Sequence, residues 1–160
     1  MGQILTWLRI DRPSTIRFGT YSTICFTDGD DMAHRGLTGA VLYAKDLHQL
    51  VQFYIAVAGL DPQKIEEGFA VLGREPSQLV IVRIPKRIAA AIQIATPPER
   101  REDTPIKLVF AAEDIASARS RAAELGGTMN AVEREWEFEG AKVCDGCDPE
   151  GNVFQIRQAG

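Results

Sequence analysis

Two segments of this chain repeat one pattern, and that repeat limits the possible fold more than any other feature. The first reads AVLYAKDLHQLVQFYIAVAGL over residues 40–60, and the second reads LVFAAEDIASARSRAAELGGT over residues 108–128. Internal repeats of this kind indicate copies of one supersecondary unit. The shift that sets Asp46 against Asp114 needs no insertion, and it also aligns Leu42 with Phe110, Leu47 with Ile115, Val57 with Leu125 and Gly59 with Gly127.

Each copy begins as a strand and continues as a helix. The apolar stretches 40–44 and 106–112 suit strands, and each leads to an acidic residue that can cap a helix. Apolar residues then recur at helical spacing. Glycines follow where a left-handed helix end needs them, at Gly59 and at Gly126-Gly127.

Further strand patterns follow both helices, punctuated by glycine and proline. After the first helix they cover 64–67, 69–72 and 78–84, and after the second they cover 128–133, 140–144 and 152–157. The chain is therefore predicted to be an α+β protein built from two tandem βαβββ modules.

The repeat also sets the predicted domain boundaries. A proline-rich linker, with a short helix or strand over 88–94, joins the modules. An N-terminal extension precedes them, and Met32 lies close enough to the repeat to be the true translation start. The predicted boundaries are 1–36 for the extension, 37–158 for the domain, 37–84 for module one, 85–105 for the linker and 106–158 for module two.

The sequence CDGCDPEGNVFQIRQ near the C-terminus contains a CxxC pair, Cys144 and Cys147. With Cys25 the cysteines number three, an odd count without an export signal, so a disulfide framework is not expected. Zinc needs four ligands, and the chain has no second paired motif. A redox CxxC should open a helix, whereas a turn sequence follows here. The two cysteines are expected to lie half-buried beside that turn.

The turn Asp148-Pro149-Glu150-Gly151 has residue types that favour each of its positions. It leads into a strand whose side chains alternate between two faces. Phe154 and Ile156 should pack beneath a helix. Val153, Gln155 and Arg157 should line the open side of the sheet, and Gln155 is the residue of interest there.

Several features of the chain together resemble the vicinal oxygen chelate superfamily. They are the tandem βαβββ units, the Lys-Asp-Leu junction before the first helix, the Phe53-Tyr54 pair and Gly59-Leu60 end of that helix, and the final Asp-Pro-Glu-Gly-Asn. Members include glyoxalase I, extradiol dioxygenases, fosfomycin-resistance enzymes and bleomycin-binding proteins. The resemblance covers residues 37–158. It implies a curved mixed sheet that forms a half-barrel cup, with the helices on its outer face, and it implies a homodimer.

In metal-using members, the first and last strands of each module supply the ligands. At two of these positions stand Gly39, which offers no side chain, and Lys107, whose ammonium has no acceptor atom. One neutral amide cannot hold a divalent ion well. The cup is therefore predicted to bind no metal and no other cofactor, and neither His34 nor His48 is expected to be a ligand. The family ligand positions hold Gly39, Lys107, Gln155 and, depending on register, Val80 or Ile81.

The open face is instead predicted to form a mostly apolar pocket for a small molecule. Lys107 and Arg157 favour an anionic or carbonyl-bearing ligand, and Tyr43 and Trp136 offer stacking surfaces. Alternatively, the two aromatic residues fill a core or a dimer contact, and both cations reach water. The candidate ligand-binding residues are Tyr43, Arg83 (or Val82), Lys107, Trp136, Gln155 and Arg157.

Three functions are compatible with this pattern. The leading one is a metal-free protein that binds a small organic molecule, as the bleomycin-binding relatives do. The second is a lyase, isomerase or dioxygenase, either metal-dependent or using Lys107 as an acid, a base or an imine-forming amine. The third is a non-catalytic interaction domain with a cup filled by its own side chains.

Charge excludes other partners. The net charge is −4, and the densest basic cluster, Arg100-Arg101, is followed at once by Glu102-Asp103. Neither a nucleic acid nor a membrane surface is therefore an expected partner. The protein is expected to be cytoplasmic.

Four glutamates alternate with other residues over 133–139. The simplest interpretation is a solvated strand or loop edge in which Trp136 and Phe138 are tucked inward. An acidic lid over the cup is the functional alternative.

Overall fold

The structure is a computed structural model that describes residues 37–159. The extension predicted over residues 1–36, with Met32, His34 and Cys25, lies outside the described residues. Within 37–159, no helix is both long and apolar enough to cross a bilayer.

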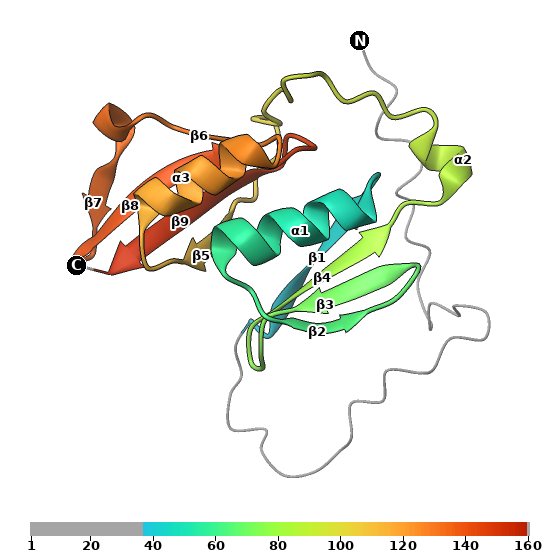
Figure 1. Cartoon of the computed structure of the whole chain (residues 1–160), viewed down its shortest axis with the longest axis horizontal. Coiled ribbons are helices and arrows are strands. Elements are labelled where there is room, and N and C mark those ends of the chain that lie inside the picture. The colour runs from blue at the N-terminus through green and yellow to red at the C-terminus, as the bar shows by residue number, and fades with distance from the viewer. Residues whose placement is uncertain (1–36, 160) are drawn as a thin grey trace. The chain divides into compact units, whose positions relative to one another are not determined.

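The first half of the described chain forms a four-stranded mixed sheet and one long helix (Figure 1). The strand order is β1-β4-β3-β2, with β1 and β4 parallel and the other pairs antiparallel. The elements are β1 (Gly39–Ala44), α1 (Leu47–Ala58), β2 (Pro62–Ile65), β3 (Phe69–Leu72) and β4 (Gln78–Arg83), followed by the short α2 (Lys86–Ala89).

The second half repeats this arrangement with one added strand. The strand order is β5-β9-β8-β6, and β7 pairs with β8 beside that path. Again the first and last strands, β5 and β9, are parallel. The elements are β5 (Leu108–Ala111), α3 (Ile115–Glu124), β6 (Thr128–Met129), a 3-10 turn (Val132–Arg134), β7 (Trp136–Phe138), β8 (Ala141–Cys147) and β9 (Val153–Ala159).

The predicted fold class is confirmed: the protein is α+β, with two curved mixed sheets and helices on one face. Register repeats along with the elements. Val41 pairs with Val80 in the first sheet, and the repeat-equivalent Val109 pairs with Gln155 in the second. The two halves therefore share backbone geometry at the strand that closes each module.

One predicted strand is much shorter than expected. The sequence pattern predicted a strand over 128–133, but pairing stops at Met129. The Arg119 side chain binds the carbonyl of Asn130 at 2.8 Å, and the Asn130 N–H bonds to the Asp145 carbonyl at 2.8 Å. The Asn130 bond continues the β6–β8 register by one residue, and the 3-10 turn Val132–Arg134 then ends the strand.

Both predicted helix starts are confirmed. The Asp46 carboxylate accepts a hydrogen bond from the Gln49 N–H at 3.0 Å, and Asp114 accepts one from Ser117 N–H at 2.7 Å. Such caps satisfy backbone donors that have no partner inside the helix. The first helix ends at Gly59, whose φ of 64° is the left-handed conformation that glycine tolerates best.

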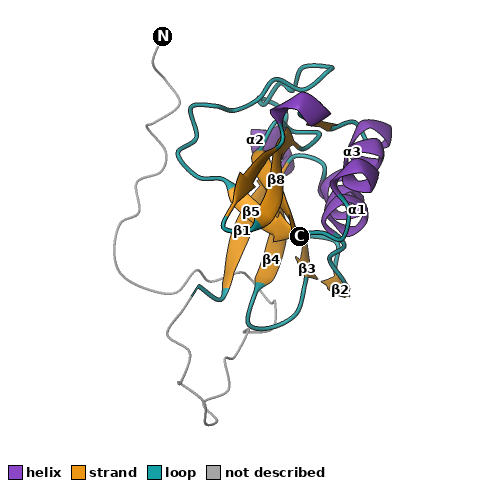
Figure 2. Ribbon diagram, turned by 90° about the vertical axis from the view of Figure 1, so that its left-hand side faces the viewer, coloured by secondary structure: helices purple, strands orange, loops and turns teal. Residues whose placement is uncertain are grey.

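The core lies between the helices and the strands, and Figure 2 shows α1 and α3 on one side of them. Phe154 and Ile156 are buried there as predicted, whereas Val153, Gln155 and Arg157 are only partly covered. The rings of Phe53 on α1 and Phe154 on β9 meet edge to face, 5.6 Å apart. The helix of the first half therefore packs onto the sheet of the second half within one chain.

The turn after β8 ties the second half to the first. The buried Asp148 carboxylate accepts hydrogen bonds from Tyr54 Oη at 3.0 Å, from Asn152 Nδ2 at 2.8 Å, and from the backbone N–H groups of Glu150 and Asn152. Burial raises the pKa of Tyr54 well above its ordinary value, and the charge of Asp148 raises it further. Burial also raises the pKa of Asp148, while its hydrogen bonds from Asn152 and Tyr54 oppose the rise.

Glu150, in the same turn, reaches the start of α1. Its carboxylate accepts hydrogen bonds from the backbone N–H groups of Lys45 and Asp46, at 3.0 and 2.7 Å. We refer to residues 148–152 as the turn latch, because their side chains join β9 to the first strand-to-helix junction.

Candidate functional site

The face of the sheets opposite the helices is open and largely apolar. Side chains on β1 and β5 alternate, so that Val41, Tyr43 and Val109 are each more than half exposed. A contiguous exposed apolar patch often marks a ligand site or an interface with another protein. This open face corresponds to the inner wall of the predicted cup.

One polar cluster interrupts this face. Lys107 Nζ lies 2.9 Å from both carboxylate oxygens of Asp145, and Gln155 Nε2 donates to Asp145 Oδ1 at 2.9 Å. The side chain of Lys107 is 36% exposed and that of Asp145 21% exposed, so the ion pair is partly shielded from water. We call these three residues the Lys107 cluster. Two of them were predicted site residues.

Trp136 joins this group across the sheet. The Lys107 ammonium lies 5.9 Å from the centre of the Trp136 ring, within the range of a cation–π contact. The ring remains 40% exposed. The structure therefore brings three predicted site residues together, namely Lys107, Gln155 and Trp136, around an aspartate that was not predicted.

The other three predicted site residues lie apart from the cluster. Arg157 donates to the Glu139 carbonyl at 3.3 Å and lies 3.7 Å from the Glu139 carboxylate, at an exposed turn. Tyr43 is on the first sheet and is 61% exposed. Register pairs Tyr43 with Val82 and the buried Ala44 with Arg83. Val82, rather than Arg83, thus shares the open face, because neighbouring residues of a strand point to opposite sides.

The four positions expected to hold metal ligands do not fit a metal ion. A Cβ on Gly39 would lie 2.4 Å from the backbone oxygen of Gln78, so this position has no room for any side chain. The register sets Val80 at the level of Gln155, and Val80 is apolar. Lys107 places an ammonium where an atom with a lone pair would be needed to coordinate the metal. Gln155 is the one position with a usable oxygen.

No other ligand set replaces these positions within residues 37–159. No three His, Cys, Asp or Glu side chains there are grouped closely enough to hold an ion. His48 is exposed on the first turn of α1. His34 lies outside the described residues.

The CxxC pair was wrongly expected to be half-buried. Both cysteines are fully buried inside β8, with Cys144 in the main core cluster and Cys147 Sγ 3.2 Å from Thr128 Oγ1. Cys144 pairs with the core residue Ile156 on β9, and the strand runs three residues further than predicted, so that it also includes Cys147. The same extension puts Asp145 directly opposite Gln155 on β9. Extending the two-residue alternation to Cys147 would have identified Asp145 from sequence.

The acidic stretch also differs from the expectation. Trp136 and Phe138 are exposed rather than tucked inward. Glu135 is the residue that is covered, with its side chain 11% exposed and paired with Arg119 of α3. The cation on the helix draws this carboxylate toward the covered side of the sheet, away from the position an acidic lid would need.

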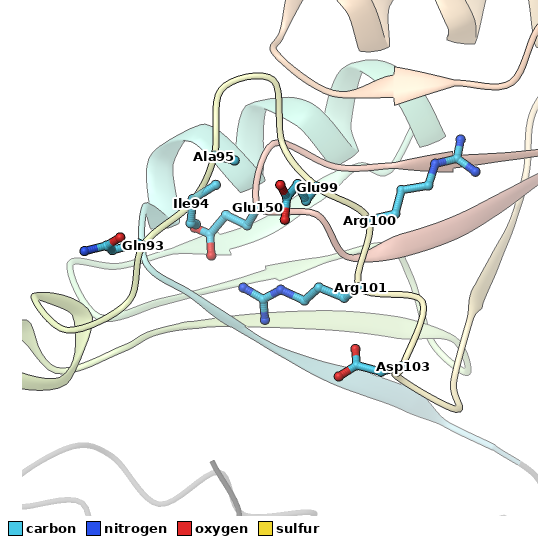
Figure 3. Close-up of a pocket in the computed structure, with 8 residues that line it drawn as sticks. All are labelled: Gln93, Ile94, Ala95, Glu99, Arg100, Arg101, Asp103 and Glu150. Atoms are coloured by element: carbon cyan, nitrogen blue, oxygen red, sulfur yellow. The ribbon is translucent and has the colours of Figure 1, made fainter. Parts of the chain in front are cut away.

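Two cavities lie along the linker between the halves. The larger, of about 460 Å³, is strongly polar, and in Figure 3 the Arg101 guanidinium points into it while Arg100 points the opposite way. Its lining residues are Gln93, Ile94, Ala95, Glu99, Arg100, Arg101, Asp103 and Glu150. It contains none of the predicted site residues.

The smaller cavity, of about 310 Å³, includes Lys107 and Asp145. Its other walls come from the residues before β5, Arg100 to Glu102 and Thr104 to Ile106, and from Val153 on β9. Cavities of this size accept small organic molecules. We therefore take the smaller cavity, together with the open face, as the candidate site.

Comparison with known proteins places this geometry in context. A family model described as a glyoxalase-like domain matches residues 39–157. No curated protein matches the chain by sequence. A glyoxalase/bleomycin resistance protein from Albidiferax ferrireducens T118 superposes with a TM-score of 0.55 at 17% identity, over 77% of this chain and 98% of that protein.

Two further structures are similar to this chain. The fosfomycin resistance protein FosX from Mesorhizobium loti has a TM-score of 0.54 at 12% identity, over 79% of this chain and 94% of FosX. TnmS3, an antibiotic binding protein from Streptomyces sp. CB03234, has a TM-score of 0.52 at 17% identity, over 81% of this chain and all 100% of TnmS3. At these identities the similarity establishes a common fold.

Proposed function

Because this chain belongs to the glyoxalase-like domain family of the vicinal oxygen chelate superfamily, we propose that it binds a small organic molecule in its cup without a metal ion. One observation carries the proposal. The Lys107 cluster is an ordered polar group on an otherwise apolar and exposed face. Small-molecule sites commonly combine apolar walls with a few fixed polar groups.

The similar structures support a binding role. TnmS3 is an antibiotic binding protein, so the fold accommodates a small molecule there, and FosX is a fosfomycin resistance protein. The exposed side chains of Val41, Tyr43 and Val109 make the open face of the sheets apolar. Their exposure also argues against a cup filled by the side chains of residues 37–159.

No contact of Lys107 favours an enzyme that uses this lysine as a nucleophile. An imine-forming lysine must first lose a proton to expose its lone pair. Here the Lys107 ammonium is held by both oxygens of Asp145. That arrangement serves a fixed positive charge better than a free amine.

A thermal-shift screen against small anions and aromatic compounds tests the proposal. A ligand present at about a hundred times its dissociation constant adds about 2.7 kcal/mol to the free energy of unfolding. We therefore expect a rise in Tm of several degrees for wild type, and a loss of most of that rise in Lys107→Ala and Gln155→Ala. Lys142→Ala is the matched control, because Lys142 also lies on the second sheet but is exposed and close to Glu135.

Two results would contradict the proposal. Either no compound raises the Tm of wild type, or the rise survives in both cup variants. Metal analysis of the purified protein separates the metal-dependent enzyme from the metal-free binder. The homodimer and the cytoplasmic location remain predictions of the sequence.

A further inference from the structure

The Lys107 cluster fixes a positive charge at one point of the cup. Two 2.9 Å contacts to Asp145 hold the ammonium, and Gln155 in turn holds Asp145 Oδ1. Asp145 and Gln155 are directly paired residues of β8 and β9, so the carboxylate and the amide that supports it both stand on neighbouring strands of the sheet. The ammonium is therefore positioned by the sheet and not only by its flexible side chain.

This ammonium still has capacity to bind a ligand. A lysine ammonium has three donors, and two of them are directed at Asp145. Among the described residues, Lys107 makes no other side-chain hydrogen bond. One N–H of Lys107 is thus available to an acceptor that enters the cup.

The cavity around Lys107 has a positive balance and an apolar side. Arg100, Arg101 and Lys107 line it, against the acids Glu102 and Asp145. Arg100 is fixed by a 2.7 Å hydrogen bond to Asn130 Oδ1, and the Asn130 N–H bonds to the Asp145 carbonyl. This network holds a second cation on the Asp145 side of the linker.

The apolar side of the same cavity comes from Ile106 and Val153. Ile106 is 69% exposed, and it stands directly before Lys107 in the chain. A ligand with an anionic end and a compact apolar body would match both sides of this cavity.

We propose that the ammonium of Lys107, fixed by Asp145, takes the place of a metal ion in this cup and anchors the carboxylate of a small organic acid. The inference rests on the proposed function, and it names the class of ligand. Hydrogen bonds between an ammonium and a carboxylate are stronger than those between neutral groups. The ligand carboxylate accepts the remaining N–H of Lys107, and its apolar body lies along Ile106 and Val153.

The same residues would disfavour a divalent ion. Asp145 is the acid to which Gln155 donates a hydrogen bond, and both of its oxygens already accept from Lys107. A divalent ion would also meet the positive charge of that lysine. Gly39, across the cup in the family pattern, cannot regain a ligand because its Cβ would collide with Gln78.

Benzoate and benzyl alcohol form a matched pair of probes for the ligand class. They share the ring and differ mainly in the carboxylate, and isothermal titration measures both against wild type and variants. We expect wild type to bind benzoate and to favour it over benzyl alcohol. Lys107→Met should weaken benzoate binding by about tenfold, with little change for benzyl alcohol. Lys142→Met removes the same charge outside the cup and should leave both affinities unchanged.

A second experiment uses Co²⁺ alone and needs no organic ligand. Lys107→His places an imidazole beside Asp145 and Gln155 and removes the resident charge. We expect this variant to bind one equivalent of Co²⁺, seen by its visible absorption, and the double variant Lys107→His/Asp145→Asn to lose it. Wild type should show no Co²⁺ signal that depends on Asp145.

The outcomes separate this inference from the proposed function. If benzyl alcohol binds as well as benzoate, or if Lys107→Met keeps the preference for benzoate, the cup binds small molecules but the carboxylate anchor is wrong. If wild type binds Co²⁺ and Asp145→Asn abolishes that binding, the inference that the Lys107 ammonium takes the place of a metal ion is wrong. If no small molecule binds while Lys107→His gains Co²⁺, the proposed function and the carboxylate anchor fail, and the exclusion of the metal stands.

Discussion

The two halves of this protein share a backbone and differ in chemistry. Val41 and Val80 face each other in the first sheet at the level where Val109 and Gln155 pair in the second. On the first sheet, the open face at this level is apolar. On the second, it carries a lysine, an aspartate and a glutamine that hold one another.

This difference shows that the two copies share backbone positions but not side-chain chemistry. Gly39 and Lys107 are equivalent by the repeat, yet the first has no space for a Cβ and the second carries the central charge of the site. On the proposed function, the polar contacts to a ligand come from the second half, because the first sheet is apolar at the same level. A ligand in this cup should be bound asymmetrically, with its polar end toward the second sheet.

The halves also differ in how they are held. The turn latch belongs to the second half, but its acids bind the first half through Tyr54 and the junction at Lys45 and Asp46. The stability of the first half should therefore depend on residues of the second.

Removing the acid at the centre of the latch should have the largest effect. Asp148→Ala deletes the acceptor for four hydrogen bonds in a fully buried position, and it leaves the Tyr54 hydroxyl without a partner. We expect the free energy of unfolding to fall by about 4 kcal/mol, because buried polar groups are costly when unpaired. Urea denaturation followed by circular dichroism measures the change.

Tyr54→Phe provides the graded control for this variant. It removes one hydrogen bond to the Asp148 carboxylate and keeps the ring in the core. The loss should be about 1.5 to 3 kcal/mol, smaller than for Asp148→Ala. A loss for Asp148→Ala that is no larger than for a surface substitution would mean that the latch does not join the halves.

Two equivalent glycines test whether the repeat positions carry equal constraints. A Cβ on Gly127 would lie 2.5 Å from the Phe53 ring and 2.6 Å from the Cys147 carbonyl, whereas a Cβ on Gly59 meets nothing within 4 Å. Gly127→Ala should therefore cost about 3 kcal/mol through overpacking. Gly59→Ala should cost about 1 to 2 kcal/mol, because φ is 64° there and alanine is strained in that region.

The same denaturation experiment compares the two alanine variants. Equal losses, or a larger loss at Gly59, would show that the halves do not press on each other at Gly127. The stability losses would then be explained by backbone conformation and not by packing between the halves.

The fold was predictable because its signals are local. Asp46 and Asp114 cap their helices, Gly59 ends the first, and alternation assigns Phe154 and Ile156 to the core. Each of these depends on neighbours within a few positions along the chain. Their agreement across two copies identifies the fold class.

The site was only partly predictable because its partners come from distant segments. Gln155 and Lys107 follow from strand alternation, but Asp145 becomes their partner only once β8 extends past Cys144. Glu135 looked solvated because its partner, Arg119, is on a helix that precedes it in the chain. Periodicity gives the face of a residue, whereas pairing across strands and helices depends on where each element ends.

The smallest expected effect concerns the helix caps, and pH distinguishes it from the others. The hydrogen bond from Ser117 lowers the pKa of Asp114 below its ordinary value of 3.8, so the carboxylate stabilises the folded state above that value. This stabilisation is lost as the pH falls through the lowered pKa. Asp114→Ala should therefore be less stable than wild type at neutral pH, and the difference should shrink in acid. Urea midpoints of both proteins measure this difference in stability.

A difference that stays constant with pH would assign the loss to packing or helix propensity and not to the charged cap. Asp46→Ala at neutral pH then tells whether the first helix depends on its single capping bond as much as the second depends on two.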